Sequence, residues 1–264
     1  MHENAALSGS SIAIIGGTSG IGLSAARALV AAGARVVVSG RDQAKVDAAI
    51  AELGEECAAG LAGDASQSAA VDAMVELAVS RFGKLDGLYH VAGGSGRSAG
   101  DGALHEVTDA GVDHTIDLNL KSLIYSNRAA VRRFREQGGG GVILNMGSVL
   151  GFSPSPEFFA SHIYAATKSA IIGFTRSIAA YYAAEGIRAN VLAPALVESP
   201  MSQRAVGDGA IMEFVRRKQP LDGGRVGQPA DLDAAAVFFL SDASKYVTGQ
   251  VLAADGGWSV SEGR

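Results

Sequence analysis

The chain has 264 residues, 48% of them hydrophobic, and a formal net charge of −5 at pH 7. This length can bury one large α/β core, and an acidic chain without a lysine or arginine block is not expected to bind nucleic acid. The first ten residues lack the charged and apolar regions of a signal peptide, and no apolar run reaches about 18 residues. We therefore expect a cytoplasmic protein without membrane contact, with a flexible N-terminus over 1–10.

Cysteine and histidine content bears on disulfides and metals. The single Cys57 excludes an internal disulfide, and the five histidines never pair at metal-ligand spacing. We expect no metal site.

Short apolar runs rich in β-branched residues alternate with alanine-rich stretches along the whole chain. Such short runs are typical of buried parallel strands, and the stretches between them are typical of helices. We expect strands at 12–15, 35–39, 88–92, 142–146 and 188–193, and helices at 21–32, 107–137 and 164–185. The alternation predicts a doubly wound parallel sheet of about seven strands with helices on both faces, in one domain over 1–264.

The first expected strand runs directly into a glycine-rich turn in which a helix begins. Glycines let the backbone approach a pyrophosphate closely, and a helix N-terminus offers free N–H groups and partial positive charge. Between a strand and a helix, such a turn is typical of a Rossmann-type dinucleotide site. We expect the cofactor to be bound here by Gly16, Thr18, Ser19, Gly20, Ile21 and Gly22.

The end of the second expected strand indicates which dinucleotide is bound. NAD sites place an acidic residue there for the ribose 2′-hydroxyl, whereas this chain has Gly40 followed by Arg41. The Arg41 guanidinium can bind a 2′-phosphate. We predict that NADP(H) is preferred and that NAD(H) is possible, because Arg41 could also simply begin a surface helix.

Tyr164 and Lys168 lie four residues apart in an expected helix, and Ser148 follows the strand at 142–146. The spacing places phenol and ammonium on one helix face, where the cation would favour phenolate and lower the pKa of Tyr164. Tyr164 is therefore a candidate general acid and base. Taken alone, such a pair is more often two ordinary helix residues with exposed tips, and the rest of the chain is what favours catalysis.

Together these segments resemble the short-chain dehydrogenase/reductase family, in its single-domain form. The likeness runs from Ile12 to about Val260 and includes the glycine turn and the order Asn119, Ser148, Tyr164, Lys168. It implies an oxidoreductase that interconverts a ketone and a secondary alcohol, with these four residues catalytic. It also implies that the cofactor is contacted by Asp64, Ala65, Ala92, Gly93, Tyr164, Lys168, Pro194, Val197 and Ser199.

The resemblance further implies a homotetramer that uses the helices at 107–137 and 164–185. Residues 200–224 have the composition of a mobile substrate lid, although a plain surface excursion fits equally well. There are two alternatives to an oxidoreductase. The first is a nucleotide-sensing protein that has no catalytic activity, and the second is an epimerase or dehydratase. The complete Asn, Ser, Tyr, Lys set argues against the first, and the short C-terminal part argues against the second.

Some residues depart from the family pattern. His90 and Val91 stand where the family has two asparagines that brace the sheet, so we expect lower rigidity there. Ala195 replaces a glycine and would narrow the nicotinamide pocket, and the long loop at 154–162 would shape the substrate pocket.

Arg97 follows the fourth expected strand, at the sheet edge where ligands bind in α/β proteins. It would meet an anionic substrate group or, alternatively, be a solvated loop residue. His90, His105 and His162 are weaker candidates for acid or base chemistry, because single histidines more often serve as hydrogen-bonding residues.

Overall fold

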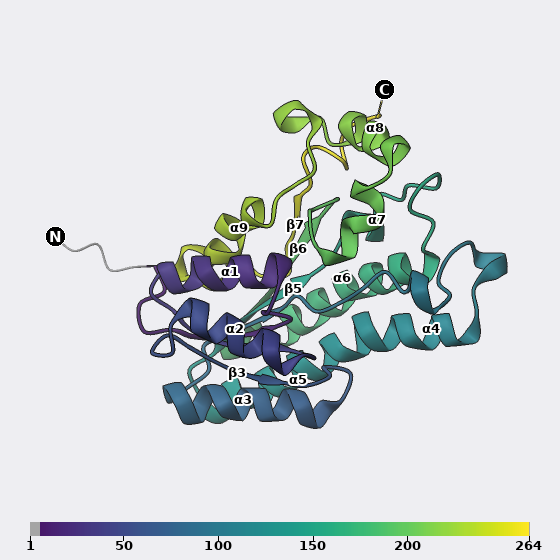
Figure 1. Cartoon of the computed structure of the whole chain (residues 1–264). Coiled ribbons are helices and arrows are strands. Elements are labelled where there is room, and N and C mark those ends of the chain that lie inside the picture. Colours follow the sequence, from purple (N-terminus) through teal and green to yellow (C-terminus); the bar gives the residue numbers. More distant parts are fainter. Residues whose placement is uncertain (1–5, 264) are drawn as a thin grey trace.

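The computed structural model describes residues 6–263 and contains one sheet of seven parallel strands in the order β3-β2-β1-β4-β5-β6-β7 (Figure 1). The connections reverse direction between β1 and β4, which confirms the expected doubly wound Rossmann-type sheet. The strands are β1 Ser11–Ile15, β2 Arg35–Gly40, β3 Ala58–Ala62, β4 Gly87–His90, β5 Gly141–Met146, β6 Ile187–Pro194 and β7 Val251–Ala254.

Helices cover both faces of the sheet and pack into two separate hydrophobic cores. One face carries α1 (Gly20–Ala31), α2 (Gln43–Leu53) and α9 (Asp233–Leu240). The other carries α3 (Ser68–Phe82), α5 (Ser122–Gln137) and α6 (His162–Tyr182). The short α7 (Gln203–Val206) and α8 (Gly209–Lys218) lie near the C-terminus at the top of the view (Figure 1).

Strand β1 illustrates how one apolar run builds both cores. Ile12 and Ile14 belong to the core beneath α1, whereas Ala13 and Ile15 belong to the core beneath α3 and α5. Successive side chains of a strand point to opposite faces, so a strand covered on both sides carries apolar side chains that point both ways, as residues 12–15 do here. All five residues of β1 are buried.

The helix expected over 107–137 starts later and is interrupted. Helix α4 spans Asp109–Ile116, a π-helical turn follows at Asp117–Lys121, and α5 continues from there. The buried Asn119 lies in this turn. A π-turn adds one residue to the helical repeat without changing the apolar pattern noticeably, so the sequence predicts an uninterrupted helix.

Two other expected segments also differ slightly from the structure at their ends. Helix α6 begins at His162, and the last residues of the helix expected at 164–185 form a 3-10 turn, Ala183–Glu185. Of the expected flexible N-terminus, residues 1–5 lie outside the described residues. Leu7 is only 2% exposed, and its N–H donates to the Ala32 carbonyl at 2.9 Å, so this part of the segment packs on the core.

Gly22 determines how tightly the glycine turn folds against α1. A Cβ atom at Gly22 would lie 2.0 Å from the Gly16 carbonyl oxygen, which is backbone and cannot move aside cheaply. We expect Gly22→Ala to lower the free energy of unfolding by about 3 kcal/mol, measured by urea denaturation. Gly209→Ala is the control and should be neutral, because Gly209 has open space around it. Equal effects of the two substitutions would contradict this reading.

Candidate active site

A cavity of about 610 Å³ opens where the central strands end. It is lined by residues from the turn after β1, the ends of β2, β4, β5 and β6, and the segment after β6. Of the catalytic and cofactor-binding residues expected from the sequence, all line it except Gly22 and Asn119, and the weaker candidates His90, His105 and His162 do not line it. The lining thus brings together Gly16, Thr18, Ser19, Gly20, Ile21, Arg41, Asp64, Ala65, Ala92, Gly93, Ser148, Tyr164, Lys168, Pro194, Val197 and Ser199.

The glycine turn forms a cradle at one end of this cavity. Gly16 has a φ of 86°, and a Cβ there would lie 2.8 Å from the backbone nitrogen of Ala92. Ser19 precedes α1 but makes no side-chain capping bond, which leaves the first N–H groups of the helix to an outside partner. Open N–H groups and the absence of side chains fit the pyrophosphate of a dinucleotide.

The residues just after β2 line the cavity and include positively and negatively charged side chains. Gly40 allows close packing of Thr18, because a Cβ at Gly40 would lie 2.4 Å from the Thr18 hydroxyl. Arg41 is exposed and lines the cavity together with Lys45. Asp42 also lines it, but its carboxylate accepts the Ala44 N–H at 2.9 Å and caps α2. Sequence reasoning missed Asp42 and Lys45.

Asp64 follows β3 and lines the cavity, as Arg41 does. Its carboxylate accepts the Ser66 N–H at 2.9 Å. This bond holds the pKa of Asp64 below its usual value, and the Arg41 guanidinium lowers it further. Asp64 is therefore ionised at neutral pH.

Ser148 and Tyr164 meet across the cavity wall. Ser148 lies just after β5 and Tyr164 in the first turn of α6, and both side chains line the cavity. Burial raises the pKa of Tyr164, and the nearby Ser148 hydroxyl opposes this rise in part. The first turn of α6 is held by Asp101, whose carboxylate accepts the N–H groups of Ile163 at 3.1 Å and Tyr164 at 2.9 Å. No local pattern identifies Asp101, because the contact joins distant segments.

Lys168 lies one helical turn after Tyr164 and is only 3% exposed. Its Nζ donates to the Met146 carbonyl at 2.9 Å and lies 5.4 Å from the centre of the Tyr164 ring. Burial lowers the pKa of Lys168 to about 8. The expectation that Lys168 lowers the pKa of Tyr164 is wrong for this structure, because burial of the phenol dominates and the ammonium lies over the ring.

Asn119 lies behind the cavity wall. Its Oδ1 accepts the Gly94 N–H at 3.1 Å, and its Nδ2 donates to the carbonyls of Gly94 at 2.8 Å and Thr115 at 2.9 Å. A Cβ at Gly93 would lie 2.7 Å from Asn119 Oδ1 and 3.5 Å from Lys168 Nζ. Asn119 thus fastens the segment after β4 beside the Lys168 ammonium.

His90 is fully enclosed at the end of β4. Its Nδ1 lies 2.8 Å from the Ser126 hydroxyl, and its Nε2 lies 3.4 Å from the Ser122 hydroxyl. These bonds tie β4 to α5, and a reciprocal amide pair between Asn127 and Asn145 ties α5 to β5. The centre of the sheet is therefore braced here without the two asparagines of the family pattern.

We expect His90 to make the fold sensitive to acid. Burial, with the nearby Lys168 charge, lowers the pKa of His90 from 6.5 to about 3. Between these two pH values His90 is protonated in the unfolded chain but neutral in the folded chain. The free energy of unfolding should fall as pH drops below about 6.5, by about 1.4 kcal/mol per pH unit from this residue. Urea denaturation at pH 6.5 and 5 measures it.

His90→Asn should reduce that loss, whereas the exposed His105→Asn should leave it intact. A loss of equal size in the His90→Asn protein would show that other groups cause the acid sensitivity.

Phe159 and Trp258 line the cavity, and Phe214 packs on both of them. Trp258 packs edge to face on Phe159 and Phe214, with each ring pair 5.6 Å apart, and its Nε1 donates to the Ser153 carbonyl at 3.3 Å. These contacts join the loop after β5, helix α8 and the C-terminal segment. Trp258 lines the cavity and was not predicted as a site residue.

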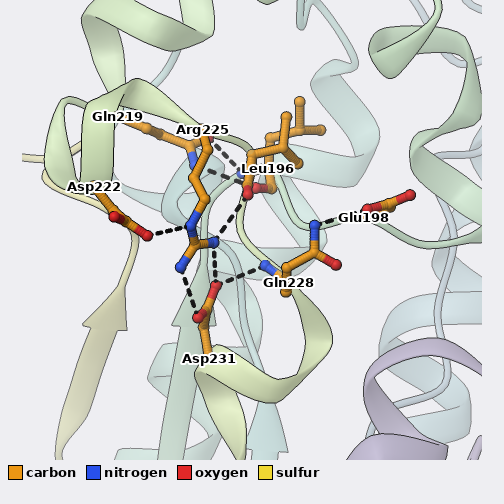
Figure 2. A network of polar contacts seen from close by, with 8 residues as sticks. Leu196, Glu198, Gln219, Asp222, Arg225, Gln228 and Asp231 are labelled. Carbon is orange, nitrogen blue, oxygen red and sulfur yellow. Dashed lines mark hydrogen bonds and ion pairs between the residues drawn. The ribbon is translucent and has the colours of Figure 1, made fainter.

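The segment 200–224 returns to the body of the protein through a polar network (Figure 2). The Gln219 side chain accepts the Leu196 N–H at 3.0 Å and donates to the Leu196 carbonyl at 3.2 Å. Arg225 pairs with Asp222 and, at 2.7 and 2.9 Å, with both oxygens of Asp231. The two ends of the segment are thereby held together, while its middle carries α7 and α8.

Comparison with known proteins decides the family. A family model described as enoyl-(acyl carrier protein) reductase matches residues 16–259. 2-(S)-Hydroxypropyl-CoM dehydrogenase 3 of Xanthobacter autotrophicus is 36% identical over 252 residues, covering 93% of this chain and 95% of its own. The chain belongs to the short-chain dehydrogenase/reductase family. It is accordingly an oxidoreductase that acts on CH–OH groups or the corresponding ketones.

Solved structures agree with this family. A gluconate 5-dehydrogenase from Burkholderia cenocepacia, in complex with NADP and tartrate, has a TM-score of 0.88 and 31% identity, covering 97% of each chain. A 3-ketoacyl-(acyl-carrier-protein) reductase from Brucella melitensis, complexed with NADH, has a TM-score of 0.84 and 30% identity, covering 96% of this chain and all of its own. Members of this family with closely similar folds thus hold either nicotinamide cofactor.

Within residues 6–263, no helix combines the length and apolarity needed to cross a bilayer. Over the same range, His, Cys, Asp and Glu side chains do not gather in a group that could hold a metal ion.

Proposed function

We propose that this short-chain dehydrogenase/reductase is an NADP(H)-dependent enzyme that interconverts a ketone and a secondary alcohol, with Tyr164 as general acid and base. The observation that carries the proposal is that Ser148, Tyr164 and the buried Lys168 line one cavity, with the Lys168 ammonium 5.4 Å from the centre of the Tyr164 ring. Two hydroxyl groups that face one cavity can both donate to a single carbonyl oxygen. They then stabilise the negative charge that develops there.

Tyr164 supplies the proton in the reducing direction. A nicotinamide bound in the cavity supplies the hydride, or accepts it in the reverse reaction. The raised pKa of Tyr164 keeps its phenol protonated at neutral pH, as a proton donor must be. Ser148 holds the carbonyl oxygen, and the Lys168 ammonium stabilises the phenolate that remains after proton transfer. Asn119 holds Gly94 of the segment after β4 in place, and we retain its expected role of fixing a water beside Lys168.

The cofactor would lie along the cavity from the glycine turn to Lys168. Gly16, Ser19, Gly20 and Ile21 would hold the pyrophosphate, and Asp64 with Ala65 would contact the adenine. The nicotinamide end would be held by residues from the later strands: Ala92, Gly93, Tyr164, Lys168, Pro194, Val197 and Ser199.

The preference for NADP(H) rests on the charges at the end of β2. Within the described residues Arg41 forms no ion pair, and Lys45 borders the same space. The Asp42 carboxylate, the only acid directly beside Arg41 in sequence, is occupied by backbone N–H groups of α2. NAD(H) is the alternative and would be favoured if Asp42 turned to the ribose instead.

We further propose a homotetramer that uses α5 and α6, in the cytoplasm. Tyr181 of α6 is 75% exposed and packs on Tyr182 with the ring centres 4.8 Å apart, so the pair offers an aromatic surface to a second subunit. Light scattering after size exclusion would give the number of subunits.

The activity is tested by following oxidation of NADPH and NADH with a panel of ketones, keto esters, quinones, steroids and keto sugars. Ketone-dependent oxidation that is faster with NADPH supports the proposal. Tight cofactor binding without turnover of any ketone, or of any secondary alcohol with NADP, would favour the nucleotide-sensing alternative.

A further inference from the structure

Two arginines face the substrate part of the cavity, and neither is neutralised. Arg97, on the loop after β4, and Arg204, on α7, both line the cavity. Within residues 6–263, neither forms an ion pair with an aspartate or a glutamate. The Asp101 carboxylate acts on Arg97 electrostatically, but its oxygens already accept N–H groups of α6.

The two guanidinium groups are neighbours because both contact the same carbonyl. Nη2 of Arg97 donates to the Phe158 carbonyl at 3.4 Å, and Nη2 of Arg204 donates to that same oxygen at 3.4 Å. Arg97 also donates to the Ala160 carbonyl at 3.2 Å. Each arginine keeps further N–H donors, since a guanidinium carries five.

Placing two like charges together beside a cavity is unfavourable unless something negative joins them. Burial, and then the charge of Arg204, lower the pKa of Arg97 below its usual value. An anion between the two groups would remove this repulsion and could be held by two-pronged hydrogen bonds.

The position of the pair relates it to the reacting group. Phe158 and Ala160 immediately precede α6, whose first turn holds Tyr164. The loop of Arg97 is fixed at the same place, because Asp101 at its end holds the N–H of Tyr164 at 2.9 Å. The same cavity is also lined by the apolar side chains of Leu150, Phe159 and Trp258.

We propose that the substrate is a ketone or secondary alcohol that carries an oxyanion, such as a carboxylate, which Arg97 and Arg204 bind together. This inference rests on the proposed function and adds the substrate class. An apolar spacer between the reacting carbon and the carboxylate would lie against Phe159 and Trp258.

The test measures binding without chemistry. The protein loaded with oxidised cofactor cannot reduce a ketone, so calorimetric titration reports affinity alone. The probes are levulinate and its next two homologues, each beside its methyl ester. We expect at least one acid to bind about tenfold more tightly than its ester, and added salt to weaken only the acid.

Arg97→Gln and Arg204→Gln should each remove most of that preference and leave the ester affinity unchanged, while Arg97→Lys should retain part of it. Arg217→Gln is the control, because Arg217 is on α8 of the same segment and does not line the cavity. Arg204 is exposed, so its replacement tests the idea even if Arg97→Gln fails to fold.

Three results would overturn the inference. In the first, each ester binds as tightly as its acid. In the second, the variants weaken binding of acid and ester equally, which would mean that the arginines only hold the Phe158 carbonyl in place. A higher Kd for the cofactor in the variants would assign the arginines to the cofactor. The proposed function fails separately: ketones would then show no turnover with reduced cofactor, whether or not the acids bind.

Discussion

Tyr164→Phe is expected to lower kcat for ketone reduction by about a thousandfold, while the Kd for the reduced cofactor stays within about twofold of the wild type. The substitution removes one hydroxyl, which donates the proton and one of two hydrogen bonds to the carbonyl oxygen. It preserves the ring that lies 5.4 Å from the Lys168 ammonium, so the packing of α6 should be kept. Initial rates at saturating cofactor, with cofactor affinity from fluorescence titration, measure both quantities.

Tyr181→Phe is the matched control, because Tyr181 lies on the same helix but is exposed and away from the cavity. Its rate should equal that of the wild type. Ser148→Ala should also slow the reaction strongly, since it removes the second donor. If Tyr164→Phe kept more than a tenth of wild-type turnover, another group would have to donate the proton.

Arg41→Asp is expected to reverse the cofactor preference. The wild type should bind NADPH about a hundredfold more tightly than NADH, because a guanidinium can form paired hydrogen bonds with the 2′-phosphate. In the variant, the new carboxylate repels that phosphate and can accept the 2′-hydroxyl of NADH. Fluorescence titration with both cofactors gives the two Kd values, and their ratio reports the change.

Arg27→Gln provides the control for removal of an arginine charge. Arg27 pairs with Glu52 away from the cavity, so the ratio of the two Kd values should not change. Lys45→Ala should weaken NADPH binding less than Arg41→Asp, because a lysine offers no paired donors. Equal wild-type affinities for NADPH and NADH would refute the NADP(H) assignment.

Local pattern predicted much of the fold correctly. The run at 35–39 became β2 at Arg35–Gly40, because an inner parallel strand is buried on both faces and the consecutive Val36, Val37 and Val38 show this requirement in the sequence. The helix at 21–32 became α1 at Gly20–Ala31 for a similar reason, with an apolar face and a glycine after it. Each of these signals depends on neighbouring residues alone.

Features that depend on distant contacts were not predicted. The π-turn around Asn119 is held by bonds to Gly94 and Thr115, and the raised pKa of Tyr164 arises from the packing that buries the phenol. The local argument from helix spacing gave the opposite direction for that pKa, since it counted the Lys168 charge and could not count burial.

The sequence by itself determined the doubly wound sheet, the glycine turn and the order of the candidate residues from Asn119 to Lys168, because these are written in short motifs and local periodicity. Only the tertiary structure decided that Arg97 and Arg204 meet at one carbonyl, that Asp101 holds the start of α6, and that Trp258 lines the cavity. The reason is physical: such contacts join segments far apart in the chain, and their distances exist only once the core has packed.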